Sequence, residues 1–590
     1  MTISTLDIIV IAVYLIAVLG LGLYQARKIK TSGDYYAGGR KFNKFYLMMH
    51  ALGTATHADE PLSVIGGAYQ KGIAGIWYTY LFLPLTPIFW LIAPYIRRTR
   101  FVTTADFFRY RYDASLAVLY SVIGVLKMSV SIGLILKSTA TLFAAMVSGG
   151  TKATATTMVT TSAASAASSG HVFAHISVET WAILIMTVIF VSYGFAGGLR
   201  ATVVTETIQG PLIVLMSLLL LPFGIYKLGG FRVLHEALPE SFFQLTGHSY
   251  EFSGAWVIAA SLTALIGWVA QPGIVAAVGS GKTELEGRVG YTYGAMIKRV
   301  CAIGWAFTGV ILAAMAAKQM LPPAQIESLA RRELAFGTAV RIFFPHGILG
   351  LVFASIFSAQ MATLSAQMVN SSALASRNLY LALLRPQATD REVLIFGRIC
   401  GIFLVAIGVM LSLLLAKVAD ALTMLLQFSA IMGVVVWGGV LWRRANSEGA
   451  WAGVTVLFGM WVLFGPVGGL VKLATGGPAW LGRFGPAEYM FQLTIIYLPA
   501  GIVTFILVSL LTKPPPTKQV DDFRMLLRTP VGEEQKLIDA GVQIIYAGST
   551  KPNRWEIEHP HLVHWGGALL AAVVCAVILG GLLVLARIGS

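Results

Sequence analysis

Six ionisable residues lie inside stretches of sequence that are otherwise apolar. They are His57, Asp59 and Glu60 in one stretch, Lys127 and Lys137 in a second, and Glu206 in a third. Charges in such stretches are costly, and they are usually retained to bind an ion or a substrate beside a partner of opposite charge. A carboxylate in this setting can bind a cationic group, share a proton or neutralise a lysine. The chemistry that these residues suggest is therefore the binding of ions and of a solute.

The two lysines have different expected roles. Lys137 lies where a long side chain can extend to the membrane surface. Lys127 lies about 20 Å of helix rise beyond Asp113, where its stretch begins, and is expected to be buried. We hypothesise that Lys127 is the counter-ion of Asp59 or Glu60, and a purely structural ion pair is the alternative. Unchanged transport and unchanged pH dependence in Lys127→Met would dismiss a functional role.

Glycine and proline interrupt two of the apolar stretches. The stretch near 45–70, second along the chain, reads HALGTATHADEPLSVIGGAYQKG. The stretch near 254–278, seventh along the chain, reads LTALIGWVAQPGIVAAVG. The interruptions fall at Gly53, Pro61 and Gly66-Gly67 in the second, and at Gly267 and Gln271-Pro272-Gly273 in the seventh. In secondary transporters such broken helices expose backbone groups at a binding site near the membrane midplane. Five spans separate the start of the second stretch from the start of the seventh, which suggests a repeated five-helix unit. Glycine and proline are, however, also common in ordinary membrane helices.

The composition places these stretches in a membrane. Of the 590 residues, 56% are hydrophobic and 12% are charged, whereas soluble domains carry about 25% charged residues. This argues against a soluble enzyme and excludes a disordered or collagen-like chain. About 14 runs are long and apolar enough to span the bilayer, near 5–25, 45–70, 75–96, 114–147, 174–194, 202–226, 254–278, 296–318, 346–380, 391–416, 420–442, 448–469, 490–512 and 563–586. We therefore predict an all-α polytopic membrane protein.

The basic residues indicate which loops face the cytoplasm. The net charge is +16, and Lys and Arg cluster in alternate loops, as the positive-inside rule requires. The loop after the seventh span contains Lys282, Arg288, Lys298 and Arg299. We expect a multi-pass protein of the plasma (inner) membrane with its N-terminus outside, a cytoplasmic loop at 513–562 and an Ala/Ser/Thr-rich external loop at 148–170. Topology explains most of the basic surplus, so no nucleic-acid partner is expected.

Four stretches of sequence carry a family resemblance. They are GDYYAGGR (33–40), YGFAGGLRATVVTETIQ (193–209), AQMATLSAQMVNSSALASRNLY (359–380) and VLWRRANSEGA (440–450). In this order they resemble the sodium:solute symporter family, which includes bacterial proline and sugar transporters. The resemblance implies two inverted five-helix repeats with broken first and sixth core helices, flanked by accessory helices. The expected organisation is an accessory helix at 1–26, repeats at 45–226 and 254–442, accessory helices at 443–512, the loop 513–562 and a last helix at 563–587.

The resemblance also implies a sodium site between the broken first core helix and the eighth. Its ligands would be the carbonyls of Gly53, Thr56 and Ala359 and the side chain of Thr363. An oxygen-only ligand set suits a hard cation. Ala362 stands at a further site position where many family members have Ser or Thr, so one hydroxyl is missing. Glu206 stands where the family usually has Asp near the ion path, which preserves the charge.

The expected substrate contacts lie on the two broken helices and on the tenth core helix. They are His57, Asp59, Glu60, Gln271 and Gln427. Asp59 and Glu60 stand at and beside a position where sugar carriers usually have neutral polar residues, so a plain sugar is less expected than the family suggests. The two glutamines could equally cap freed backbone groups.

The function expected from these features is secondary active transport and not catalysis. A small-molecule solute would cross the lipid bilayer by alternating access, with sodium as the coupling ion and no other cofactor. No nucleotide is expected, because AAVGSGKT (276–283) ends a membrane helix and lacks the strand that precedes a phosphate loop. The alternatives are proton coupling through Asp59 or Glu60, which Ala362 favours, and a transporter-like sensor, which is disfavoured because the chain ends directly after its last span.

Overall fold

The computed structural model describes residues 4–57, 59–148, 178–247, 251–414, 418–463, 487–548 and 552–590. Apart from an isolated backbone bridge between Phe42 and Gly281, these ranges contain helices and turns but no β-structure. Among the described helices, seven are long and apolar enough to cross a membrane, and three shorter ones are also apolar. The all-α membrane fold is thereby confirmed. Nearly all of the predicted external loop 148–170 lies outside the described residues.

The helices fall into three groups along the chain. The first group is α1 (Thr5–Ala26), α2 (Ser32–Ala37), η1 (Gly38–Arg40), α3 (Lys44–Ala55), α4 (Asp59–Lys71), η2 (Gly72–Ile76), α5 (Trp77–Tyr80), α6 (Thr86–Arg98), α7 (Thr104–Arg111), α8 (Ala114–Ser148) and α10 (Val178–Leu228). The second is α11 (Phe231–Ala237), η3 (Glu240–Phe243), α12 (Gly254–Trp268), α13 (Ile274–Gly279), α14 (Glu284–Ala317), α15 (Pro323–Ser328), η4 (Arg332–Leu334), α16 (Ala335–Phe343), α17 (Ile348–Ala373), the π-helix η5 (Leu374–Leu384), α18 (Asp390–Leu414) and α19 (Val418–Leu441). The last is α20 (Ser447–Val462), α22 (Ala487–Leu511), α23 (Thr517–Arg528), α24 (Glu534–Asp539), α25 (Arg554–Glu558), η7 (Leu562–Gly566) and α26 (Gly567–Arg587).

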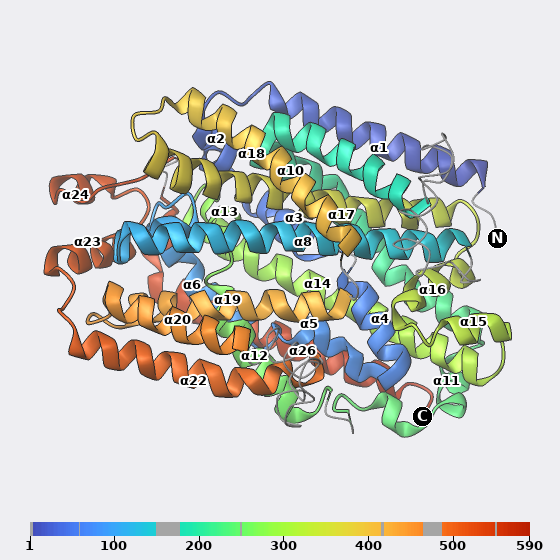
Figure 1. The fold of residues 1–590 in the computed structure, drawn as a ribbon. Helices are drawn as coiled ribbons and strands as arrows, with labels where there is room; N and C mark the ends of the chain where they lie inside the picture. Colours follow the sequence, from blue (N-terminus) through green and yellow to red (C-terminus); the bar gives the residue numbers. More distant parts are fainter. Residues whose placement is uncertain are drawn as a thin grey trace, which may run out of the picture.

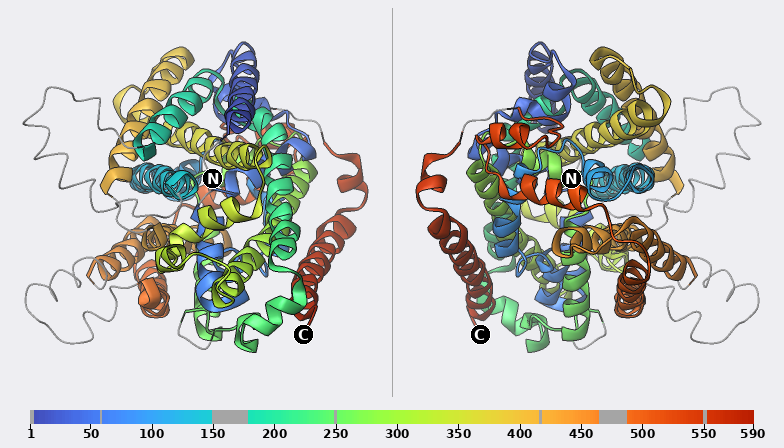
Figure 2. Two further views of the ribbon diagram at one scale, coloured as in Figure 1. Left: turned by 90° about the vertical axis from the view of Figure 1, so that its right-hand side faces the viewer. Right: turned by 90° about the vertical axis from the view of Figure 1, so that its left-hand side faces the viewer.

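The long helices run side by side in one bundle (Figure 1). α10 packs against α17, α1, α14 and α3, and α17 also packs against α8 and α18. α20 and α22 pack on each other, while α26 lies at the edge of the bundle against α6 and α14 (Figure 2). The helices that carry the candidate site residues are therefore surrounded by other helices.

Each of the two stretches is interrupted once, between Gly53 and Pro61 and at Gln271-Pro272-Gly273, whereas Gly66-Gly67 and Gly267 lie inside helices. α3 ends at Ala55 and α4 begins at Asp59, with Thr56 in an extended conformation after α3. α12 ends at Trp268 and α13 begins at Ile274. Proline between α12 and α13 favours the second interruption, because it lacks the amide hydrogen that a continuous helix needs. Backbone carbonyls at both places fall outside regular helical hydrogen bonding and can bind ligands.

The predicted spans 174–194 and 202–226 are two arms of α10, which is bent at Gly198. A straight helix of its 51 residues would be about 77 Å long, more than twice the thickness of the hydrocarbon core. Gly198 has φ 53° and ψ −148°, a combination close to a region that is essentially restricted to glycine. A Cβ atom there would also lie 2.5 Å from Cδ2 of Tyr35. The glycine therefore permits both the bend and the close contact.

α14 begins earlier than its predicted span. The apolar run 296–318 suggested a span preceded by a basic cytoplasmic loop, but the helix already begins at Glu284. Its glycines allow close packing on α3, since a Cβ atom at Gly290 would lie 2.3 Å from Cβ of Leu47. Lys298 and Arg299 lie in the interior of this helix and are buried. Their assignment to a cytoplasmic loop is therefore wrong.

The segment 513–562 is folded against the rest of the chain. Its helices α23 and α24 lie at the opposite end of the bundle from the N-terminus (Figure 1). The buried guanidinium of Arg100 donates hydrogen bonds to the carboxylate of Glu534 and to the carbonyl oxygens of Thr529 and Pro530. One arginine after α6 thus holds the start of α24 in place.

Candidate functional site

A cavity of about 250 Å³ lies beside the two helix breaks, and we call it the larger cavity. Its walls come from α3, α4, α6, α8, α12, α13, α14, α17 and α19 and from the residues between α12 and α13. The predicted site residues that line it are His57, Asp59, Glu60, Lys127, Gln271 and Thr363. The fold therefore gathers residues that are far apart in the sequence around one space.

The two carboxylates of α4 each have a nitrogen partner. Oδ1 of Asp59 contacts Nδ1 of His57. Oε2 of Glu60 forms an ion pair with Nζ of Lys298 on α14, and the same ammonium donates to the carbonyl oxygen of Ala55. Lys298 thereby connects the end of α3 to the start of α4 across the break.

Lys127 is not the counter-ion of either carboxylate. Its Nζ donates a hydrogen bond to Oγ of Ser429 on α19. Asp59 and Glu60 are bonded to other residues, so the hypothesis of an ion pair with Lys127 is wrong. The physical reason is the orientation of α14, which presents Lys298 to the start of α4.

Three of the predicted sodium ligands meet between α3 and α17. The hydroxyl oxygen of Thr363 lies 3.1 Å from the carbonyl oxygen of Gly53 and 3.1 Å from that of Ala359. We call these three residues the oxygen cluster. The hydroxyl of Thr56 is also buried, and it has no hydrogen-bond partner in the part of the chain that the structure describes. Ala362 adds no side-chain oxygen, and its carbonyl accepts a hydrogen bond from a serine on the same helix.

Glu206 on α10 lies next to the oxygen cluster. Its Oε2 is 2.5 Å from Nδ1 of His50 on α3, and both side chains are buried. Its Oε1 is buried and has no hydrogen-bond partner among the described residues. This oxygen would lie 3.2 Å from a Cβ atom placed on Gly53. A carboxylate oxygen thus lies beside one of the predicted ligands.

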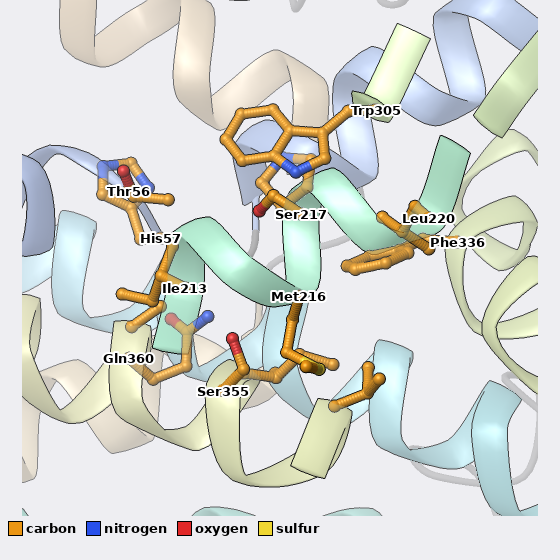
Figure 3. Close-up of a pocket in the computed structure, with 14 residues that line it drawn as sticks. Thr56, His57, Ile213, Met216, Ser217, Leu220, Trp305, Phe336, Ser355 and Gln360 are labelled. Carbon is orange, nitrogen blue, oxygen red and sulfur yellow. The ribbon is translucent and has the colours of Figure 1, made fainter. Parts of the chain in front are cut away.

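A smaller cavity of about 40 Å³ adjoins the first helix break. Thr56, His57 and Gln360 lie toward one end of it, and Leu220 and Phe336 lie toward the other (Figure 3). The amide of Gln360 is buried, and within the described ranges neither its nitrogen nor its oxygen has a hydrogen-bond partner. Gln360 is not among the residues predicted from the sequence, although its position directly after the predicted ligand Ala359 was an available signal.

Aromatic rings line part of the larger cavity. Phe89 stacks on Trp268 with ring centroids 4.1 Å apart, and Nε1 of Trp268 donates to the hydroxyl of Tyr291 at 2.8 Å. Gln271 lies at the adjacent break. Gln427 is not among the residues that line the cavity, and its Oε1 accepts a hydrogen bond from Nε1 of a tryptophan on α20. The structure therefore brings Gln271, but not Gln427, to the cavity.

Lys298 and Arg299 line the larger cavity but are absent from the predicted site. Both fall inside the predicted span 296–318, so treating every ionisable residue inside a span as a candidate would have identified them. The guanidinium of Arg299 lies over the ring of Phe82, 5.8 Å from its centroid. The helix that was expected to begin after a basic loop instead contributes two cations to the site.

Known proteins resemble this chain over most of its length. A family model described as "Sodium:solute symporter family" matches residues 35–457. A sodium/pantothenate symporter of Haemophilus influenzae is 25% identical over 481 residues, which cover 78% of this chain and 90% of that protein. A sodium/proline symporter of Escherichia coli is 24% identical over 540 residues, which cover 87% and 95%. A solved structure described as the substrate-bound outward-open state of a Na⁺-coupled sialic acid symporter aligns with TM-score 0.68 and 18% identity, over 87% of this chain and 98% of that one.

Proposed function

The chain belongs to the sodium:solute symporter family, and from that premise we propose that it moves a small organic solute across the membrane together with sodium. Its relatives are transporters, so the chain is a transporter and not an enzyme. In this proposal the solute occupies the larger cavity and sodium occupies the oxygen cluster. The energy comes from the ion gradient.

The observation that carries the proposal is the geometry of the oxygen cluster. Oxygen ligands without sulfur or nitrogen are those that a hard cation prefers. Sodium bound there would join α3 to α17, because Gly53 lies on the first helix and Ala359 and Thr363 lie on the second. Glu206 places negative charge beside the cluster and offsets the hydroxyl that Ala362 does not supply.

The same geometry supports coupling between ion and solute. Thr363 belongs to the oxygen cluster and also lines the larger cavity. Sodium would hold the end of α3 in place. Lys298 would link this end to α4, because its ammonium is bonded to both Ala55 and Glu60. We take alternating access to be a movement of the repeat 45–226 against the repeat 254–442. The protein would lie in the plasma membrane, with its N-terminus outside and α23 and α24 in the cytoplasm.

Thr363→Ala tests the sodium site. Loss of one ligand should weaken sodium binding about tenfold, since a single hydrogen-bond-sized contact is worth about 1 kcal/mol or somewhat more. The measurement is the sodium concentration that gives half of the maximal rise in unfolding temperature of the purified protein.

Thr263→Ala is a matched control for this test. Thr263 is a buried threonine of α12 whose hydroxyl donates to the carbonyl oxygen of Ala259 at 2.8 Å, outside the oxygen cluster. This variant should keep the sodium response of the unchanged protein. Equal sodium responses in both variants, or no response in the unchanged protein, would remove the sodium assignment.

Proton coupling is the second candidate, and contacts between carboxylates and imidazoles favour it. Asp59 contacts His57, and Glu206 contacts His50. A carboxylate in contact with an imidazole can share a proton with it, which makes each pair a candidate coupling site. Solute uptake into liposomes that follows a pH gradient and ignores sodium would select this candidate.

A further inference from the structure

The larger cavity carries more positive than negative charge. Among its described lining residues, the cations are Lys127, Lys298 and Arg299 and the carboxylates are Asp59 and Glu60. Lys298 is bonded to Glu60, and Asp59 contacts a histidine. This pairing leaves Lys127 and Arg299 without a directly bonded carboxylate in the described lining.

Arg299 is the more unusual of the two. Its side chain is 3% exposed, and Nε and Nη1 have no hydrogen-bond acceptor among the residues that the structure describes. Glu60 lies close enough to attract the guanidinium, but one of its carboxylate oxygens is already bonded to Lys298. Buried donors without acceptors are destabilising, and a buried charge even more so. An arginine retained in this state has unused capacity to bind an anion.

Lys127 adds donors from another wall of the same cavity. An ammonium group has three N–H donors, and among the described residues Nζ of Lys127 donates to one neutral hydroxyl, that of Ser429. Lys127 lies on α8 and Arg299 on α14, so the two cations approach the cavity from different helices.

We propose that the larger cavity recognises the carboxylate of a small organic acid through Arg299 and Lys127. The planar guanidinium presents two parallel donors that match the two oxygens of a carboxylate. The stacked rings of Phe89 and Trp268 supply a surface for the carbon skeleton. Oδ2 of Asp59 is buried and has no hydrogen-bond partner in the described ranges, so it can accept from a hydroxyl or amino group of the same molecule. This inference rests on the proposed function and specifies its solute as an acid that also carries a hydrogen-bond donor.

Matched pairs of compounds test the carboxylate. The probes are lactate and lactamide, proline and prolinamide, pantothenate and panthenol, and glucuronate and glucose, with sodium phosphate as an inorganic anion. Each is added to the purified full chain at constant sodium chloride, and the unfolding temperature is measured against concentration. We expect at least one acid to stabilise the protein while its partner without a carboxylate does not. Stabilisation by the partners alone, by phosphate equally, or by none of the compounds overturns the proposal.

Substitutions of Arg299 and Lys127 then assign the carboxylate to its contacts. Arg299→Gln should weaken binding of the stabilising acid about tenfold to a hundredfold, the usual effect of losing a charged hydrogen bond, whereas Arg299→Lys should lose less. Lys127→Met provides a second measurement of the affinity for this acid in case Arg299→Gln does not fold. Arg443→Gln is the control, because Arg443 is 59% exposed and pairs with Asp521 away from the cavity. Unchanged affinity in both Arg299→Gln and Lys127→Met overturns the assignment.

The sodium response separates this inference from the proposed function. A protein that is stabilised by sodium but discriminates no acid from its partner retains sodium coupling and loses the carboxylate site. A protein that binds an acid through Arg299 but shows no sodium response retains the carboxylate site and loses sodium coupling.

Discussion

Lys298 is bonded to residues on both sides of the first helix break. Its ammonium bonds the last residue of α3 and a carboxylate in the first turn of α4, and it comes from a third helix. The side chains of Lys298 and Glu60 are 5% and 13% exposed. In such a place each charge depends on the other, because removal of one leaves the other buried and uncompensated.

Glu60→Gln should therefore be strongly destabilising. Breaking a buried pair from one side costs about 3–5 kcal/mol, whereas replacing both partners with neutral residues is often close to neutral. We expect the unfolding temperature to fall in Glu60→Gln and to recover largely in the double variant Glu60→Gln/Lys298→Met. Thermal unfolding of the purified proteins measures this difference.

An exposed ion pair serves as the control for the variants of Glu60 and Lys298. Arg232 and Glu236 are 86% and 50% exposed, and such pairs contribute little to stability. Glu236→Gln should leave the unfolding temperature unchanged. A double variant at Glu60 and Lys298 that is no more stable than Glu60→Gln alone would show that the two charges are not coupled.

At the scale of the helix, Gly198 determines the shape of α10. The residue permits a backbone conformation that other residues rarely adopt, and it lets Tyr35 pack against the bend. Tyr35 also donates a hydrogen bond to the carbonyl oxygen of Gly194 in the same helix. The bend thus joins the two arms of α10 to α2, the short helix that follows α1.

Gly198→Ala should destabilise the protein through this bend. The strained backbone alone costs about 1–3 kcal/mol, and the Cβ atom must also displace Tyr35. Gly20→Ala is the control, since Gly20 lies in α1 with no atom within 4 Å of an added Cβ, and a helical glycine gains from this change. We expect a lower unfolding temperature for the first variant and no loss for the second. Equal unfolding temperatures would show that Tyr35 and the bend adapt freely.

The helix breaks could be predicted from the sequence, whereas the pairing of charges could not. Pro272 and the neighbouring glycines weaken a helix locally, so they are visible without knowledge of the fold. The partner of Glu60 depends on how α14 is rotated against α4, which packing of the whole bundle determines. Arg299 falls inside the predicted span 296–318, but it was counted with the basic residues of the preceding loop because the polar first turns of α14, from Glu284 onward, carry no apolar signal. A spanning helix buried among other helices need not be apolar at both ends.

At the scale of the molecule, the segment 513–562 connects the two proposed repeats. Arg100, which follows α6, is bonded to Glu534 at 2.9 Å. Glu284, at the start of α14, accepts a hydrogen bond from the amide of Val531 at 2.9 Å. α6 lies in the proposed repeat 45–226 and α14 in the proposed repeat 254–442, so one segment contacts both. A movement of one repeat against the other would have to stretch or break these contacts.

Glu556 makes a further attachment of this segment dependent on pH. It lies 2.8 Å from the guanidinium of Arg288 on α14. Burial, with a smaller contribution from Glu284, raises the pKa of the Glu556 carboxyl group to about 7, against the opposing effect of Arg288. The folded protein therefore binds a proton that the unfolded chain, with the ordinary pKa near 4.5, has already released. The stabilising contribution of this proton is complete below about pH 4.5 and is lost as the pH rises toward 7.

Glu556→Gln should remove this dependence, because glutamine is neutral at every pH. The unfolding temperature of the variant, taken relative to the unchanged protein, should rise between pH 5 and pH 8. The full change corresponds to at most about 3 kcal/mol for a shift of this size. Glu558→Gln, at an exposed neighbour on the same short helix, should show no such trend. A difference between Glu556→Gln and the unchanged protein that stays constant across this range would mean that Glu556 is charged throughout, and that the segment is held at α14 by a permanent ion pair.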